Sequence, residues 1–219
     1  MRIAISFPSR EMVHATWALD LAQLVAVAMA DGHQMGIFNA EGTLICDQRT
    51  ELAKRAVESG ASHVLWLDTD MRFPKEALRR LLAHDKAIVA ANYVSKGLPV
   101  GPTARDFRDG GWWKVPTYKD STGLQKVSAA GFGVMLVKTE VFKAMEYPWF
   151  HIGYAKENDQ YTGEDVYFCI HAERAGYETF IDHDLSKEVR HTGSIEYNHE
   201  LFTGWDRKVA APALVQAAD

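Results

Sequence analysis

Two aspartates, Asp68 and Asp70, flank Thr69 directly after the apolar run 64–67. In a strand, side chains two residues apart point to the same side, so these two carboxylates would converge. Open parallel sheets bind ligands at the carboxyl ends of their strands, and converging carboxylates there require water or a cation. The triplet therefore predicts a site for a divalent metal ion.

Two other interpretations of the triplet follow from the same residues. An EF-hand is excluded, because its glycine position holds Phe73 and its final glutamate position holds Arg79. The second is structural: the aspartates cap the following helix or pair with Arg72. The triplet alone does not separate this structural role from a metal site, so the rest of the chain must decide.

A second group of residues comes late in the chain. Glu164 and Asp165 open a predicted helix after Gly163, and His191 follows at some distance. Each has a structural explanation of its own, since carboxylates are favoured in the first turn of a helix and an isolated imidazole often just packs. Together with the aspartate pair, however, an imidazole suits Mn²⁺ and a separate carboxylate suits a general base.

The elements that must position these residues alternate between strand and helix in the first 95 residues. Hydrophobic spacing and turn residues predict strands at 2–7, 35–39, 63–67 and 87–91, and helices at 13–30, 48–60 and from Pro74 onward. Such alternation predicts a mainly parallel sheet with helices on both faces.

The second half of the chain has a different composition. Glycine and proline are frequent in 97–123, which predicts hairpins and loops, and an apolar stretch follows at 127–137. We further expect short helices at 139–145 and 164–175, a loop at 148–162, a strand at 177–181 and a helix or frayed end after residue 203.

Composition narrows the class of protein. The 219 residues carry a net charge of -5 and only two cysteines, which excludes a disulfide scaffold and a zinc ribbon. The N-terminus lacks the pattern of a signal peptide, and no apolar run is long enough to cross a membrane, so we expect a cytoplasmic protein. Motifs of P-loop enzymes, zinc proteases, Rossmann dehydrogenases and α/β-hydrolases are missing from the sequence.

In their order and approximate spacing, these residues resemble the GT-A glycosyltransferases, which use nucleotide-sugar donors. The triplet 68–70 is similar to their DxD motif, Glu164 and Asp165 to their acidic pair, and His191 to their late metal-binding histidine. The stretch 129–136, with Gly131, is similar to the small-residue segment that lines their site. The resemblance spans about residues 1–195.

The resemblance implies an α/β fold of the GT-A, Rossmann-like type, a mixed and mainly parallel sheet flanked by helices. It also implies one domain over residues 1–205, with a nucleotide-binding half at 1–95 and an acceptor half at 96–205. Residues 206–219 are then a C-terminal tail.

The resemblance further implies a metal-dependent transfer from a nucleotide sugar, expected to be a UDP-sugar, with inversion. Mn²⁺ or Mg²⁺ would be held by Asp68, Asp70 and His191 and would stabilise the departing diphosphate. Asp165 is the expected catalytic base, with Glu164 next. The residues expected to bind the donor are Pro8, Ser9, Arg10, Arg49, Asp68, Thr69, Asp70 and Gly131.

The acceptor is expected to be a glycan or lipid-linked sugar, or a hydroxylated base in phage DNA, in a bacterial or phage-infected cell. Between Lys96 and Lys126, six basic and three acidic residues give a charge of +3, which leaves -8 on the rest of the chain. Basic residues beside tryptophans are typical of nucleic-acid surfaces, although a solvated hairpin of mixed charge explains them too.

Two further functions stay open at this point. One is a non-catalytic module that binds a nucleotide sugar. The other is a divalent-metal phosphohydrolase or nuclease, because clustered carboxylates and a histidine also serve phosphoryl chemistry.

Overall fold

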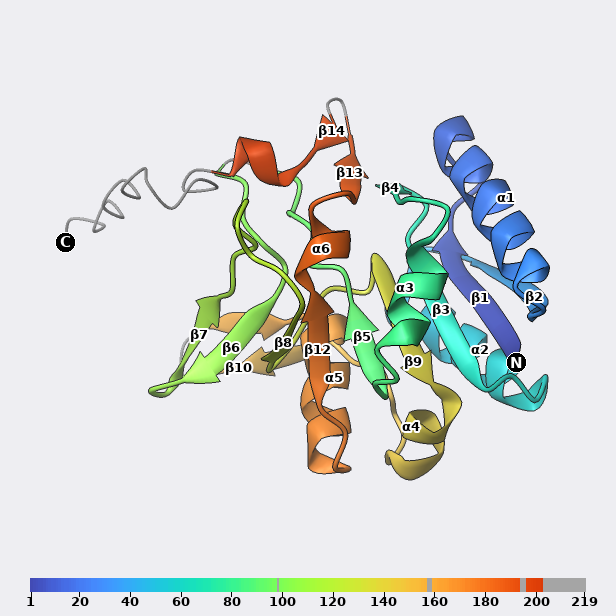
Figure 1. Ribbon diagram of the computed structural model, residues 1–219. Coiled ribbons are helices and arrows are strands. Elements are labelled where there is room, and N and C mark those ends of the chain that lie inside the picture. The colour runs from blue at the N-terminus through green and yellow to red at the C-terminus, as the bar shows by residue number, and fades with distance from the viewer. Residues whose placement is uncertain (98, 157–158, 194–195, 203–219) are drawn as a thin grey trace.

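The computed structural model describes residues 1–97, 99–156, 159–193 and 196–202, and its centre is a seven-stranded sheet (Figure 1). The strands lie in the order β2 (Gln34–Glu41), β1 (Arg2–Ser9), β3 (His63–Leu67), β9 (Val134–Lys138), β5 (Ile88–Ala90), β12 (Thr179–Asp182) and β8 (Leu124–Val127). Because β9 lies between β3 and β5, a strand from the second predicted half of the chain is inserted between two strands from the first half.

The sheet is mixed, and helices cover it, which confirms the predicted fold class. Neighbours are parallel at β1–β2, β1–β3 and β5–β12. They are antiparallel at β3–β9, β5–β9 and β8–β12. The sheet is thus less parallel than the alternation in the first 95 residues suggests, because β9 and β8 come from the second half of the chain and run against their neighbours.

Helices cover both faces of the sheet, as predicted. They are α1 (Ala15–Ala30), α2 (Ile45–Glu58), α3 (Ala77–Ala83), α4 (Thr139–Ala144), α5 (Glu164–Arg174) and α6 (His183–Ser186). The period of two in β3 separates two cores: Val64 and Trp66 pack with α2, α4 and α5, whereas Leu65 and Leu67 pack with α1, α3 and α6 (Figure 1). Burial of both strand faces explains why 64–67 is continuously apolar.

Smaller elements lie outside the main sheet. They are the hairpin β6 (Arg105–Arg108) and β7 (Gly111–Lys114), the hairpin β10 (Gly153–Ala155) and β11 (Gln160–Thr162), the short sheet β4 (Met71–Arg72), β13 (Arg190–Thr192) and β14 (Glu196–Tyr197), and the 3-10 helix η1 (His199–Leu201).

The first of these hairpins confirms the prediction for 97–123. The prediction of a loop at 148–162 is wrong for 153–155 and 160–162, where strands of three residues form, with Tyr154 paired opposite Tyr161. Their rings lie 5.0 Å apart, a cross-strand aromatic contact that favours the hairpin.

The predicted boundaries shift at several helices. The helix expected from Pro74 begins at Ala77, after a turn, and the helix expected at 48–60 spans Ile45–Glu58. The predicted tail at 206–219 and the helix or frayed end after residue 203 lie outside the described residues. In the part of the chain that the structure describes, none of the helices has the length and apolar character needed to cross a membrane.

Candidate functional site

A cavity of about 520 Å³ opens where β1 and β3 end, between these strands, the start of α2 and the start of α5. Its lining includes most of the residues singled out from the sequence: Pro8, Ser9, Arg10, Arg49, Asp68, Thr69, Asp70, Glu164 and His191. Lys96 also lines it. Asp165 and Gly131, although described, are not among the lining residues.

Both aspartates line the cavity, but their carboxylates meet different partners, contrary to the convergence expected from strand geometry. β3 ends at Leu67, and the next residues form a turn in which the amide of Met71 donates to the carbonyl of Asp68 at 3.0 Å. A turn does not keep the period of two, so the two carboxylates meet different partners. They belong to two separate clusters.

The first, the Arg49 cluster, consists of Arg49, Asp68 and Glu164. The Arg49 guanidinium donates from Nη2 to Asp68 Oδ1 at 3.0 Å and from Nε to Glu164 Oε1 at 3.1 Å. Arg49 is 3% exposed, and its guanidinium lies over the rings of Phe132 and Trp66, at 4.9 and 5.7 Å from their centroids. A hydrogen-bonded guanidinium between two carboxylates is the arrangement that makes such burial possible.

Burial and charge act against each other in the Arg49 cluster. Burial by itself would lower the pKa of Arg49, but the carboxylates of Asp68 and Glu164 outweigh it and raise that pKa. Burial raises the pKa of Asp68, with the charge of Arg49 opposing. The guanidinium therefore stays charged and holds Asp68 at the floor of the cavity. Arg49 is no solvated helix residue.

Asp165 lies next to this cluster at the N-terminus of α5. Its Oδ1 accepts a hydrogen bond of 2.7 Å from the amide of Val166. Burial and the neighbouring charge of Glu164 raise the pKa of Asp165, with the Val166 amide opposing. A raised pKa makes this carboxylate a stronger proton acceptor than an ordinary aspartate.

The second, the Asp70 cluster, consists of Asp70, Lys96 and His191. Strand β13 pairs with β4 so that His191 lies opposite Met71, and the amide of Thr192 donates to the carbonyl of Asp70 at 2.7 Å. This pairing sets His191 Nε2 at 3.3 Å from Asp70 Oδ2, and the ammonium of Lys96 contacts the same oxygen. Burial opposes ionisation, but hydrogen bonds from His191 and Lys96 outweigh it and lower the pKa of Asp70 to about 2.

The orientation of the His191 ring is informative. Its Nδ1 lies 2.9 Å from the carbonyl oxygen of Val94, and because a carbonyl only accepts, Nδ1 carries the hydrogen. In the neutral ring, Nε2 then directs a lone pair at the Asp70 carboxylate. Lys96 already places a positive charge on this carboxylate, and a proton or a metal ion between Nε2 and Oδ2 would remove the repulsion of their facing lone pairs. The donor set of the pair therefore fits a divalent ion.

The predicted metal trio is not assembled as expected. Across the described residues, no three histidine, cysteine, aspartate or glutamate side chains gather as a group able to hold a metal ion. Asp70 and His191 meet, whereas Asp68 is paired with Arg49. A metal at this place would have two protein ligands.

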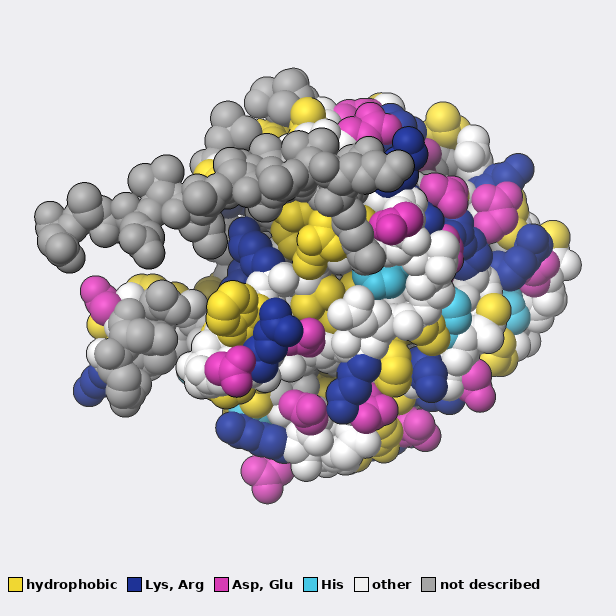
Figure 2. Space-filling view, turned by 60° about the vertical axis from the view of Figure 1, so that its left-hand side comes forward, with side chains coloured by type: hydrophobic (Ala, Val, Ile, Leu, Met, Phe, Trp, Pro, Cys, Tyr) yellow, Lys and Arg dark blue, Asp and Glu magenta, His cyan; other side chains and the backbone are white. Residues whose placement is uncertain are grey.

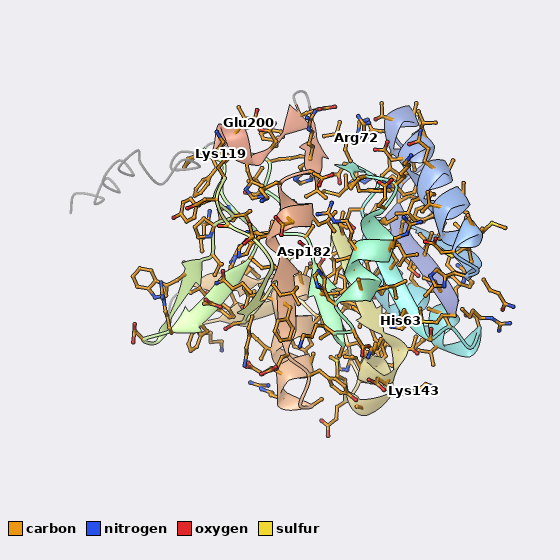
Figure 3. The ribbon with its side chains drawn as sticks, viewed as in Figure 1. His63, Arg72, Lys119, Lys143, Asp182 and Glu200 are labelled. Atoms are coloured by element: carbon orange, nitrogen blue, oxygen red, sulfur yellow. The ribbon has the colours of Figure 1, made fainter. Side chains whose placement is uncertain are left out.

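The structural alternative, pairing of the aspartates with Arg72, is not found. Arg72 is the second residue of β4 and lies next to α1 (Figure 3), and its guanidinium pairs with Asp20 and with Glu196. These contacts tie α1 and β14 to the strand that follows the triplet. Asp68 and Asp70 remain directed to the cavity.

Tyr93 was not recognised as a site residue from the sequence, and Lys96 was counted only as a charge. Tyr93 is buried, its hydroxyl accepts from the Gly133 amide at 3.2 Å, and its ring meets the His191 ring edge-on, with centroids 5.3 Å apart. A Cβ on Gly131 would lie 2.5 Å from the Tyr93 hydroxyl. Gly131 and Gly133, on either side of the buried Phe132, thus make room for Tyr93. The only sequence signal was a tyrosine just after a strand, which is weak.

The region expected to select the acceptor shows mixed charge. In Figure 2, where the side of the molecule carrying β6 and β7 comes forward, basic and acidic side chains intermingle with apolar ones. Lys126 is paired with Glu178 at 2.8 Å, and the Arg108 guanidinium lies over the exposed ring of Trp113. This face, as far as the structure describes it, is closer to the solvated hairpin than to a basic surface.

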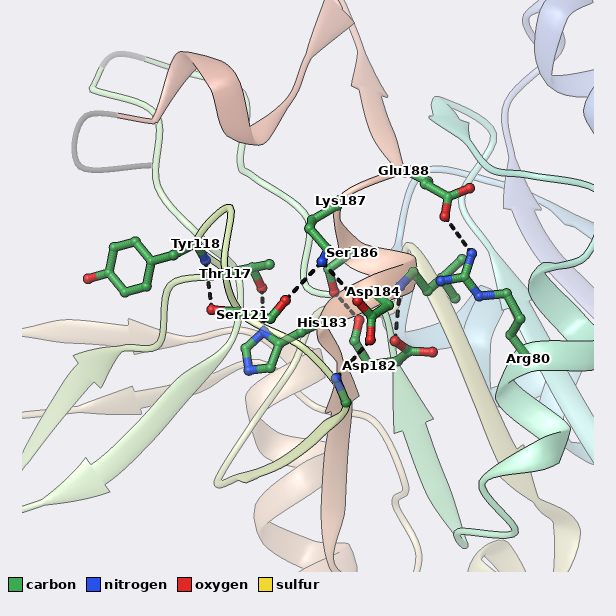
Figure 4. A network of polar contacts seen from close by, with 12 residues as sticks. Arg80, Thr117, Tyr118, Ser121, Asp182, His183, Asp184, Ser186, Lys187 and Glu188 are labelled. Carbon is green, nitrogen blue, oxygen red and sulfur yellow. Dashed lines mark hydrogen bonds and ion pairs between the residues drawn. The ribbon is translucent and has the colours of Figure 1, made fainter. Parts of the chain in front are cut away.

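A further polar network surrounds α6, away from the residues that line the cavity (Figure 4). Lys187 binds Asp184 and the carbonyl of Ser121, while His183 Nδ1 lies 2.9 Å from the hydroxyl of Thr117. These contacts fasten the segment between the β6–β7 hairpin and β8 to α6.

Comparisons with known proteins bear on the fold. No family model matches the sequence, and no curated protein matches it. Among solved structures, A197 from STIV is similar, with a TM-score of 0.55 and 17% identity over 88% of this chain and 86% of that chain. A glycosyltransferase involved in the glycosylation of the major capsid of PBCV-1 has a TM-score of 0.36 and 15% identity, over 67% of this chain and 68% of that chain. The likeness to A197 shows a shared fold, and the second is too weak to add to it.

Proposed function

We propose that this chain is a metal-dependent glycosyltransferase that moves a sugar from a nucleotide-sugar donor to an acceptor hydroxyl with inversion. The observation that carries the proposal is the contact of Asp70 with His191 at 3.3 Å, on the wall of a cavity at the carboxyl ends of β1 and β3. Cavities at this edge of an open α/β sheet are the usual ligand sites.

Asp70 and His191 are the residues that would hold Mn²⁺ or Mg²⁺. Two protein ligands suit these ions, which complete their coordination with water and with phosphate oxygens of a substrate. When bound, the ion would supply Lewis-acid stabilisation of the charge on the departing diphosphate. His191 is held in the right tautomer for this role by the carbonyl of Val94.

The remaining cavity residues would bind the donor. Pro8 and Ser9 end β1 and Arg10 follows it, and all three line the cavity together with Asp68 and Thr69. Arg49 contributes by positioning, since its Nε and Nη2 are bound to Glu164 and Asp68, and its Nη1, for which the structure shows no partner among the described residues, is buried. We take UDP-sugars as the first donors to test.

Asp165 is the proposed base for the acceptor hydroxyl, with Glu164 as the next candidate. Burial and the charge of Glu164 raise the pKa of Asp165, which favours proton acceptance. Glu164 lines the cavity but already accepts from Arg49. The acceptor is proposed to be a glycan or lipid-linked hydroxyl, or a hydroxylated base of phage DNA, in the cytoplasm of a bacterial or infected cell.

Calorimetric titration of UDP with and without Mn²⁺ tests the proposal. We expect binding that depends on Mn²⁺ and is lost in Asp70→Asn, whereas Asp31→Asn, an exposed aspartate paired with Arg79, leaves it unchanged. Absence of UDP binding in the wild type with Mn²⁺ would overturn the proposal. Transfer to an acceptor that is lost in Asp165→Asn with donor binding intact would separate the enzyme from a mere binding module.

A further inference from the structure

Lys96 is the feature of the site that the proposed function does not use. It lies in the loop after β5, and its ammonium forms an ion pair with Asp70 Oδ2. The same oxygen faces His191 Nε2 at 3.3 Å. A lysine cation therefore rests on the carboxylate oxygen that the proposed metal ion would use.

Lys96 differs from Arg49, the other cation paired with an aspartate of the triplet, in how far its side chain is exposed. Arg49 is 4% exposed in its side chain and is bound to two carboxylates, whereas the Lys96 side chain is 36% exposed. An exposed ion pair is weak, and a lysine side chain has a flexible stem with three rotatable donors. The ion pairs of Arg49 are therefore held in place by burial, whereas Lys96 can give up its contact with Asp70 to another cation.

We propose that Lys96 is a built-in counter-ion of the donor site, which holds Asp70 in the empty site and is displaced when a divalent ion binds. Two cations in contact with one carboxylate oxygen repel each other, so the ammonium must leave. Released beside the cavity, it is a point charge suited to the diphosphate. The inference rests on the proposed function, since it assumes that a metal ion binds Asp70.

The test compares Lys96→Met with the wild type, because methionine removes the charge and keeps an unbranched stem. Without nucleotide, we expect Lys96→Met to bind Mn²⁺ about two- to fivefold more tightly, because Mn²⁺ no longer has to displace an exposed ion pair. Calorimetry, or the electron paramagnetic resonance signal of free Mn²⁺, measures this affinity. With saturating Mn²⁺, we expect it to bind UDP more weakly.

The control is Lys126→Met, which removes an exposed lysine paired with Glu178 outside the cavity and is expected to change neither affinity. Thermal melting checks that both variants are folded. Equal or weaker Mn²⁺ binding by Lys96→Met, with binding abolished in Asp70→Asn, would overturn the role of Lys96 and leave the metal site standing. Failure of every variant to bind Mn²⁺, even with UDP, would overturn both proposals.

Discussion

The two charged clusters of the cavity differ in how their charges are held. In the Arg49 cluster, a guanidinium that is 3% exposed binds two carboxylates above a floor of aromatic rings. In the Asp70 cluster, the side chain of Asp70 is 32% exposed, and its carboxylate contacts the imidazole of His191 and the ammonium of Lys96. Both clusters line the cavity, but the first is anchored in the folded core by the buried Arg49, whereas the second is open to the space that a ligand would fill.

The Arg49 cluster therefore stabilises the fold, whereas the Asp70 cluster is available to bind a ligand. Buried charges must be paired at all times, because an unpaired charge in the core destabilises the fold, whereas an accessible charge can exchange its partner at small cost. Mutations should therefore affect stability in the Arg49 cluster and ligand binding in the Asp70 cluster.

The largest effect is expected for Arg49→Met. Removing the guanidinium leaves Asp68 and Glu164 uncompensated beside the core, and such a break costs about 3–5 kcal/mol of unfolding free energy. Urea denaturation measures it. Arg79→Met, which breaks an exposed pair with Asp31, should lower the unfolding free energy far less. Similar losses in the two variants would show that burial does not distinguish the clusters.

Next in size is a pH effect at His199, a buried imidazole bound to the carbonyl of Asn92. Burial lowers the pKa of His199 from 6.5 to about 4, against the hydrogen bond to Asn92. Between these values the unfolded chain binds more protons, so stability falls as pH drops from 6.5 to 4, by at most about 3 kcal/mol.

Urea denaturation at several pH values measures this dependence, and His199→Gln, which keeps a hydrogen-bond donor, should flatten it. An unchanged slope in that variant would mean that another group is responsible. His191, which lines the cavity, is the comparison. Its replacement by glutamine should weaken Mn²⁺ binding more than it changes the pH dependence of the unfolding free energy.

Gly131→Ala should lower the unfolding free energy by an intermediate amount and should also affect the Asp70 cluster. Its Cβ would collide with the Tyr93 hydroxyl, and overpacking of this kind costs about 1–3 kcal/mol. Because the Tyr93 ring touches His191, we also expect weaker Mn²⁺ binding. Gly111→Ala is the matched control, since its nearest neighbour would be 3.9 Å away. Unchanged stability in Gly131→Ala would show that Tyr93 moves freely.

The smallest effect on stability is expected for Asp70→Asn. Its ion pairs are partly exposed, so unfolding free energy should drop by less than about 1 kcal/mol while Mn²⁺-dependent UDP binding is lost. Denaturation and calorimetry on the same sample measure both. A loss of several kcal/mol would place Asp70 with the buried cluster instead.

Much of the local structure could be predicted from the sequence, because it depends on neighbouring residues. The apolar run 64–67 followed by polar residues indicated a strand whose end opens on a site, and Gly163 before two acidic residues indicated the start of a helix. The residues proposed for the donor site mostly line one cavity. The hairpin at 153–162 was missed because strands of three residues have too few positions to show a period.

Local patterns were enough to predict the alternation of strands and helices, the apolar strand β3 and the residues that could carry chemistry, since these follow from side-chain type and short spacing. Which of these residues meet depends on contacts between distant segments. The turn at 68–70 sent two adjacent carboxylates to different partners, and the β4–β13 pairing brought His191 to Asp70. Insertion of β9 between β3 and β5 joined both halves in one sheet. Pairings between distant segments depend on register and packing across the whole molecule, which no local pattern encodes.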